Sequence, residues 1–563
     1  MPPYVPPFAI NSFLVGKATY MVIEHLLQDK TDYDYYIFDA FFDIEEMNKI
    51  FSGKTDELAP GASQTLVIPV RGYFLASYDT YGAGTYIRSA GDYYLALGSD
   101  AHDAVNNILA AKGFTTANGM TADGDAALTY TWNQAELDAE TYSVSAQTGY
   151  AVENVFDTAD LNYYDGYEYE YMTRSDWEGT WPVKTQLDAT EQMMQALSNY
   201  YYETPADAPD VDSFTQGADN GLKLTDMVDV DFDDDATWDK FLDQLTVEQL
   251  CNTFTDSKAT NAIPELDIPG NTKGDDDTNA AGGAIQWVSH PLTARAWNTD
   301  LNTQRGYYEG LICMLIGKDE IWYGAGNLHR HSYGGRAGQY WSEDATLDYY
   351  NGYYEAEAMQ SVGTIMCVKH MCCNDQEAQR TGLSVFVDEQ ALREIYLRAF
   401  EGAFDGGALS VMATTGRVGT TLGKNYPSLM TTVLRDEWGF QGHVTSDGYV
   451  NTGYYNNTLE ELEAGQDYSC CDSAGSNAQK ILNAIRGGDG NVLKLMRLAA
   501  KRNLYVMAHS ARMNGLGSGA TVISIVPAWE SAVFAANIVL GAAVLVLAVL
   551  AVIQERKNRK EDR

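Results

Sequence analysis

Charged side chains follow short apolar stretches of the chain at places where they could carry chemistry. The apolar stretch 363–368 is followed directly by Lys369 and His370, and a second apolar stretch ends just before Asp447. Arg336 lies in a glycine-rich segment ahead of an expected helix. A carboxylate among cationic side chains stays ionised and can act as a nucleophile. Taken singly, Lys369 and Arg336 also fit structural ion pairs, and an aspartate at a strand end often caps a helix.

The segment 211–515 has the pattern of elements that could position these side chains. Helical periodicity alternates there with short apolar strands, which is typical of βα units and a parallel sheet. The expected helices are 246–254, 390–404 and 428–438, and the expected strands are 363–368, 409–412 and 443–446. The length suits an α/β fold of the (β/α)8 TIM-like barrel type, whose active-site residues lie at the C-terminal ends of the strands. We therefore expect Lys369, His370 and Asp447 to share one face of a barrel.

The composition restricts the partners of the chain. The 563 residues include 78 acidic and 37 basic side chains, which gives a net charge of −41. Such a surface repels phosphate backbones, so we expect no nucleic acid partner, whereas neutral sugars are not repelled. The seven cysteines include two adjacent pairs but no spacing typical of metal ligands. We expect free thiols, no metal and no organic cofactor.

Several segments resemble glycoside hydrolase family 3 in residue type, order and spacing. The resemblance is carried by Gly335-Arg336, Ser342-Glu343-Asp344, Lys369-His370, Asn374-Asp375-Gln376-Glu377 and the run from Leu434 to Asp447. It covers about residues 220–515. The resemblance implies a retaining glycosidase that cleaves terminal β-linked sugars, with β-glucosides or short oligosaccharides as the expected substrates.

The same resemblance implies a role for each matching side chain. Asp447 corresponds to the nucleophile, which attacks the anomeric carbon and forms a glycosyl-enzyme. Arg336, Lys369 and His370 correspond to the residues that hold the hydroxyls of the sugar at the cleaved bond. Asp277 is a weaker match to the aspartate of the family's Asp-Gly-Pro sugar clamp, because the glycine and proline are absent here.

Retention of configuration needs a second carboxyl group about 5 Å from the nucleophile, acting as acid and then as base. The resemblance implies that this group belongs to a separate α/β sandwich domain, for which too few residues precede the expected β unit. The sequence therefore assigns no acid/base. The alternative to an active hydrolase is an inactive or weakly active carbohydrate-binding membrane protein on a degenerate hydrolase scaffold.

The N-terminal third of the chain has a different pattern of expected elements. Residues 32–114 contain short strands with turns between them, which predicts an all-β sandwich similar to the fibronectin III-like module of family 3 members. This module would precede the barrel, the reverse of the usual order. We interpret residues 1–31 as the remnant of an upstream region and 115–210 as an acidic, tyrosine-rich connecting region with loose structure.

The C-terminus reads as a membrane anchor. Residues 532–553 are apolar over about the 20 residues that an α-helix needs to cross a bilayer. The basic tail 554–563 predicts a cytoplasmic end, which places the bulk of a single-pass protein on the outer side of the cell membrane. No convincing export signal opens the chain, so we expect an upstream segment to supply it.

Overall fold

The computed structural model describes most of the chain beyond residue 71. The described residues are 72–98, 101–118, 120–171, 188–198, 202–255, 261–275, 287–296, 298–324, 326–330, 334–378, 380–448, 457–470, 472, 475–513, 516–517, 520 and 528–561. The chain divides into two compact units, Met1–Ser518 and Gly519–Arg563. Each unit is considered by itself.

The first unit is organised around a parallel five-stranded sheet in its described residues. The strands, in spatial order, are β5 (Lys273–Asp275), β6 (Glu320–Tyr323), β7 (Ile365–Met371), β9 (Ser410–Ala413) and β12 (His443–Ser446). All four neighbouring pairs are parallel. Single parallel bridges carry the pairing further, from Thr445 to Tyr468 and from Ser469 to Thr255. The α/β architecture and the expected strands 363–368, 409–412 and 443–446 are confirmed, while full closure of a barrel stays a prediction.

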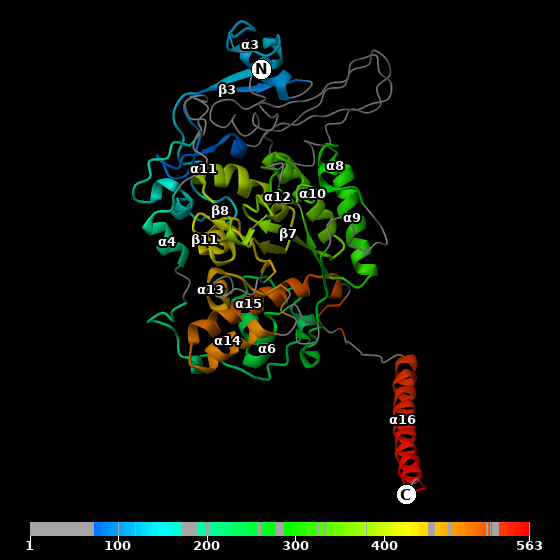
Figure 1. The fold of residues 1–563 in the computed structure, drawn as a ribbon. Coiled ribbons are helices and arrows are strands. Elements are labelled where there is room, and N and C mark those ends of the chain that lie inside the picture. Colours follow the sequence, from blue (N-terminus) through cyan, green and yellow to red (C-terminus); the bar gives the residue numbers. More distant parts are fainter. Residues whose placement is uncertain are drawn as a thin grey trace, which may run out of the picture. The chain divides into compact units, whose positions relative to one another are not determined.

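Helices cover one side of this sheet. Met366 and Val368 of β7 point to that side, where they join a large apolar core with Tyr323 and Val444. Figure 1 shows α9, α10 and α12 packed beside β7. The helices of this region are α8 (His290–Ala294), α9 (Thr299–Leu315), α10 (Ala345–Gln360), α11 (Glu389–Ala391), α12 (Arg398–Asp405) and the π-helical segments η10 (Leu392–Leu397) and η12 (Ser428–Glu437). Elements α11, η10 and α12 together match the expected helix 390–404, and η12 matches the expected helix 428–438.

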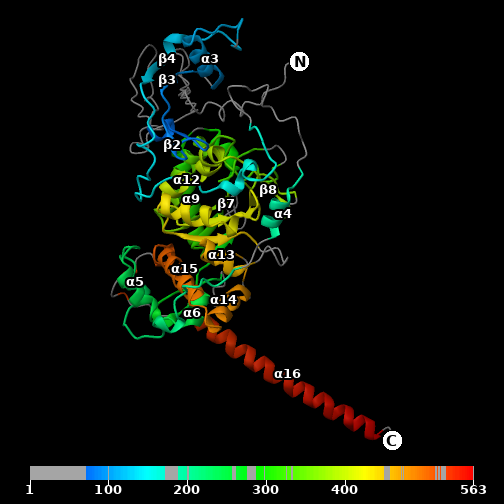
Figure 2. The ribbon, with the colours of Figure 1, turned by 90° about the vertical axis from the view of Figure 1, so that its left-hand side faces the viewer.

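A second apolar core is formed by helices that come before β5 or after β12 in the chain. Its helices are α5 (Asp235–Leu242), α6 (Val247–Asn252), α13 (Thr458–Ala464), α14 (Ser476–Arg486) and α15 (Gly490–Ala508). Figure 2 shows α6, α14 and α15 gathered together. Trp238 and Phe241 are fully buried in this core. Helix α6 begins with a capping box in which Thr246 and Gln249 satisfy each other's backbone N–H groups, which explains its boundary.

The other side of the sheet carries a buried polar layer. Lys273, Glu320, Ser410 and His443 are the first residues of β5, β6, β9 and β12. Glu320 lies 3.0 Å from the Lys273 ammonium and 3.2 Å from His443 Nε2. It also accepts hydrogen bonds from Ser410 at 2.9 Å and from the Tyr468 hydroxyl at 2.7 Å. One carboxylate thus ties the N-terminal ends of four strands together.

The N-terminal part of the first unit contains antiparallel strand pairs. β1 (Ser77–Tyr78) pairs with β2 (Tyr86–Ile87), and β3 (Gly91–Ala96) pairs with β4 (Thr129–Gln134). Helix α3 (Ala101–Ala111) packs against β3. Strands β1, β2 and β3 lie within the segment 32–114, where the sequence predicts short strands, and residues 32–71 lie outside the described residues. A fibronectin III-like sandwich stays a prediction.

The structure differs from the expected division at residue 114. Strand β4 completes its pair with β3 from within the segment 115–210, which we expected to be a loose connection. Further along, Phe156 and Tyr164 are buried, and the backbone N–H of Phe156 donates to Glu389 at 3.1 Å. The polar sequence did not predict these contacts, because isolated aromatic residues without periodicity do not indicate a helix or a strand. The segment also contains α4 (Glu191–Ser198).

Short strands form a separate small sheet after the main one. β10 (Arg417–Val418) pairs with β8 (Ser384–Val385) in parallel and with β11 (Thr421–Leu422) antiparallel. The second unit is described as one helix, α16 (Ala528–Glu561). Its segment Ser531–Asn558 is long and apolar enough to cross a membrane by length and composition. The helix continues through most of the basic tail 554–563.

The polar layer predicts a stability effect that depends on pH. Burial raises the pKa of Glu320, but the Lys273 ammonium, His443 and the Tyr468 hydrogen bond outweigh burial and hold this pKa below its usual value. Glu320→Gln leaves Lys273 buried without its counter-ion, so the free energy of unfolding in urea should fall by about 3–5 kcal/mol. In the unfolded chain the Glu320 carboxyl titrates at about pH 4.3. The fall in the free energy of unfolding caused by Glu320→Gln should therefore have its full size above that pH and become smaller below it.

Glu357→Gln is the matched control, because Glu357 is exposed on α10. It should change the free energy of unfolding by no more than about 0.5 kcal/mol. Equal effects of the two substitutions would contradict a structural role for the polar layer.

Candidate active site

Asp447 follows β12 directly and lies at the C-terminal end of the sheet. Its backbone N–H donates to Ala413 O at 3.1 Å, which continues the pairing with β9, and the residue is 8% exposed. Oδ1 accepts the backbone N–H of Gly448 at 2.6 Å. Oδ2 lies 2.8 Å from Arg380 and 3.6 Å from His370 Nε2. Among the described residues none donates a well-formed hydrogen bond to Oδ2.

The capping alternative for Asp447 can be compared with the next helix in the described residues. Within the described residues, α13 begins at Thr458 with Asn457 as its N-cap. Asp447 therefore does not cap that helix. A carboxylate oxygen that is neutralised by a nearby cation, but not saturated by hydrogen bonds, keeps a lone pair for chemistry.

His370 is the neighbour of Asp447 on β7. It is buried, and its Nδ1 lies 3.2 Å from the Tyr340 hydroxyl. The Tyr340 oxygen accepts from Asn374 Nδ2 at 2.7 Å, so its own proton points to His370 Nδ1. The Nε2 proton of a neutral His370 then faces Asp447.

The charge state of His370 follows from its surroundings. Burial first, and then the positive charges of Lys369, Arg336 and Arg380, hold the pKa of His370 well below its usual value. The imidazole is therefore neutral at pH 7 and remains so on mild acidification. It can donate one hydrogen bond to a sugar hydroxyl or to Asp447 without competing with the arginines for charge.

Arg380 and Glu377 connect Asp447 to Arg336 in a line of alternating charges. Arg336 Nε donates to Glu377 Oε1 at 2.7 Å, and Glu377 Oε2 lies 3.5 Å from the same Arg380 nitrogen that contacts Asp447. Arg336 also donates to Gln339 at 3.0 Å. Each cation thus has a carboxylate partner, which fixes its direction toward Asp447.

Gly335 makes the close approach of Arg336 and Glu377 possible. Its φ is +78°, a left-handed conformation that favours glycine, and an added Cβ would lie 2.8 Å from Glu377 Cβ. The backbone of the glycine-rich segment therefore packs directly on the Glu377 side chain.

Lys369 forms an ion pair, as the sequence allowed for this residue. Its buried ammonium donates to Asp275, the last residue of β5. Asp277, the predicted sugar clamp, lies outside the described residues. The ion pair places Lys369 at the same C-terminal end of the sheet as His370 and Asp447, because β5 and β7 run parallel.

The structure therefore gathers Arg336, His370 and Asp447, and adds Arg380 and Asp275, which sequence reasoning missed. Arg380 could have been noticed as the cation three residues after Glu377. Asp275 opens the Asp-Asp-Asp run that contains Asp277, so only its place in the strand distinguishes it. The described residues hold no group of three or more His, Cys, Asp or Glu side chains that could bind a metal ion.

Comparison with known proteins shows a family similar to the part of the chain that carries this site. Residues 322–501 match the model of the glycosyl hydrolase family 3 N terminal domain, a range that includes Arg336, Lys369, His370, Arg380 and Asp447. This segment, about a third of the chain, is similar to glycoside hydrolase family 3. The family 3 match begins within β6 and ends within α15.

Curated relatives are named β-glucosidases. The chain is 26% identical to the β-glucosidase of Ruminococcus albus over 83% of this chain and 47% of the relative. It is 29% identical to that of Rhizobium radiobacter over 48% of this chain and 34% of the relative. The chain thus spans about half or less of the length of these proteins.

A solved structure shows the same fold. The β-glucosidase of Paenibacillus barengoltzii is 23% identical and aligns with a TM-score of 0.57 over 84% of this chain and 51% of that chain. The alignment covers more of the chain than the 322–501 segment alone.

Gly335→Ala tests whether the left-handed backbone of Gly335 and its close contact with Glu377 matter for stability. The left-handed φ costs a Cβ-bearing residue about 1–2 kcal/mol, and the contact with Glu377 adds to it. We expect the free energy of unfolding to fall by about 2 kcal/mol, measured by urea titration. Gly338→Ala is the matched control, since nothing lies within 4 Å of its added Cβ and its φ is not in the left-handed region. A Gly335→Ala variant as stable as Gly338→Ala would show that the segment relaxes freely.

Proposed function

We propose that this chain is a retaining glycoside hydrolase that acts on terminal β-linked sugars, most simply β-glucosides, with Asp447 as its nucleophile. The curated relatives are named β-glucosidases, which supports the substrate class. The observation that carries the proposal is the environment of Asp447 Oδ2. It has a cation at 2.8 Å and lacks a hydrogen-bond donor among the described residues.

In the proposed first step, Asp447 Oδ2 attacks the anomeric carbon as the bond to the leaving-group oxygen breaks. The leaving oxygen takes a proton from a general acid, and an ester joins the sugar to Asp447. In the second step water attacks the same carbon, gives its proton to the base, and releases the sugar and the free carboxylate. Arg380, 2.8 Å from Oδ2, orients the attacking carboxylate.

The sugar hydroxyls are proposed to bind the cations around Asp447. Arg336, His370 and Lys369 provide donors at the C-terminal end of the sheet, and each is oriented by a partner in the described residues. Asp277 would accept hydrogen bonds from hydroxyls of the same sugar. These contacts orient the anomeric carbon toward the nucleophile.

The general acid is proposed to lie outside the described residues. Glu377 shares Arg380 with Asp447, but a second guanidinium, that of Arg336, lies 2.7 Å from it. Both carboxylate oxygens of Glu377 thus face guanidinium groups, which leaves neither oxygen directed at a leaving group. Glu377 therefore fits the role of a positioning residue for Arg380.

Two structural proposals accompany the functional one. We infer that the sheet closes as a (β/α)8 barrel, supported by the parallel bridges from Thr445 to Tyr468 and from Ser469 to Thr255. We also infer that residues 32–114 include a fibronectin III-like module, supported by the antiparallel pairing of β1 with β2.

We further propose that α16 anchors the chain in the cell membrane by a single span, with residues 532–553 in the bilayer. The length and apolar character of Ser531–Asn558 support a span. The basic residues Arg556 and Lys557 at its end favour a cytoplasmic C-terminus. The hydrolase would then face glycosides outside the cell.

A covalent label tests the nucleophile. Incubation with a 2-deoxy-2-fluoro-β-glucoside should trap the ester, and peptide mass spectrometry should place the label on Asp447. Asp447→Ala should lose both the label and the turnover of a chromogenic β-glucoside, with a fall in kcat of at least about 10³-fold. Asp157→Ala, at an exposed aspartate, should keep both. Label on another residue would overturn the assignment, and sugar binding without label or turnover would support the carbohydrate-binding alternative.

Membrane extraction tests the anchor. The full chain, expressed in a bacterial host, should stay in the membrane pellet after alkaline carbonate treatment, because its apolar span is held by the bilayer. The chain ended at residue 518, which retains the whole first unit, should move to the soluble fraction. Release of the full chain by carbonate would contradict a transmembrane anchor.

A further inference from the structure

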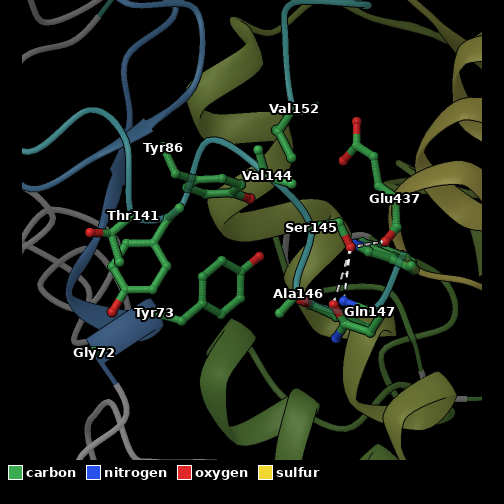
Figure 3. A pocket seen from close by; sticks show the side chains of 13 residues that line it. Gly72, Tyr73, Tyr86, Thr141, Val144, Ser145, Ala146, Gln147, Val152 and Glu437 are labelled. Carbon is green, nitrogen blue, oxygen red and sulfur yellow. Dashed lines mark hydrogen bonds between the residues drawn. The ribbon is translucent and has the colours of Figure 1, made fainter. Parts of the chain in front are cut away.

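A cavity of about 340 Å³ lies between the N-terminal strands and the helical layer of the first unit. One side is formed by Tyr73 and Tyr86, and the other by the segment that carries Ser145, Ala146 and Gln147, as Figure 3 shows. The volume is within the range of small-molecule sites. This cavity is distinct from the site around Asp447, because it shares none of its residues.

Aromatic rings supply the apolar surface of the cavity. Tyr73 lies 5.3 Å from Tyr86 and 5.9 Å from Tyr142 between ring centroids, and Trp438 completes the lining. Arg398 holds the Tyr73 ring in place by a cation–π contact at 4.2 Å from the centroid. Such rings offer flat faces to the C–H groups of a sugar together with hydroxyls that donate or accept hydrogen bonds.

The polar groups of the cavity match a neutral ligand. Its two carboxylates already have cationic partners, Glu401 with Arg398 at 2.7 Å and Glu437 with Arg393 at 2.7 Å. A cationic ligand would have to compete with these arginines, and the net charge of −41 disfavours an anion. A neutral ligand rich in hydroxyls avoids both penalties.

The cavity and Asp447 lie at opposite ends of β12. Trp438 precedes the strand His443–Ser446, and Asp447 follows it. Neither β12 nor Asp447 lines the cavity, so a sugar bound there does not contact the nucleophile. That sugar cannot be the residue under attack.

We propose that this cavity is an auxiliary carbohydrate-binding site that takes one or two sugar rings of a neutral β-linked oligosaccharide. It would hold substrate chains beside the protein without cleaving them. The proposal goes beyond the proposed hydrolase activity and does not depend on it.

Ala146→Trp tests the site by filling it. Ala146 is exposed and lines the cavity, so an indole would occupy the space while removing no side-chain contact. Ala122→Trp, at an exposed alanine outside the lining, is the matched control. Both are made in the full chain with Asp447→Ala, and cellotetraose binding is measured by isothermal titration calorimetry.

Ala146→Trp should remove one cellotetraose site per chain, and Ala122→Trp should remove none. If the site around Asp447 also binds, the stoichiometry falls from two to one, and if the proposed function fails, it falls from one to zero. Gln147→Ala, a milder change at an exposed residue, should weaken the same site about tenfold. With Asp447 intact, Ala146→Trp should leave kcat for a small chromogenic glucoside unchanged within about twofold. Equal stoichiometry for Ala146→Trp and Ala122→Trp would overturn the proposal.

Discussion

The candidate site depends on the ion pair between Arg380 and Asp447. An aspartate that is 8% exposed would lose much of the solvation of its charge, and the guanidinium at 2.8 Å replaces it. Arg380 in turn is oriented through Glu377, and Glu377 through Arg336. The alternation lets four charged side chains share a small space, since every neighbour in the line has the opposite sign. Removing any one would leave a like-charged or unpaired neighbour.

The two ends of the sheet use buried charge in different ways. At the N-terminal end, Glu320 is saturated by Lys273, His443 and two hydroxyls, so it has no capacity left for a ligand. At the C-terminal end, Asp447 has a cation but an incomplete set of hydrogen bonds in the described residues. The first arrangement ties strands together, and the second leaves an oxygen free to react.

The N-terminal segments are integral to the first unit. Tyr78 N–H donates to Glu394 at 2.5 Å, and Phe156 N–H donates to Glu389. Burial raises the pKa of Glu394 to about 8. Both glutamates precede α12, so the upstream strands contact the elements that lead into β9. The aromatic cavity arises at this junction, which neither part could form by itself.

The sequence alone determined the βα alternation, the strand ends that carry His370 and Asp447, and the apolar C-terminal helix. These follow from periodicity and side-chain type, which act over a few residues. Only the tertiary structure decided that Arg380 contacts Asp447, that Lys369 pairs with Asp275, and that β4 belongs with β3. Each of these joins residues distant in sequence or rests on the direction of one side chain. Such contacts depend on how the elements pack, and the linear pattern of residue types does not specify them.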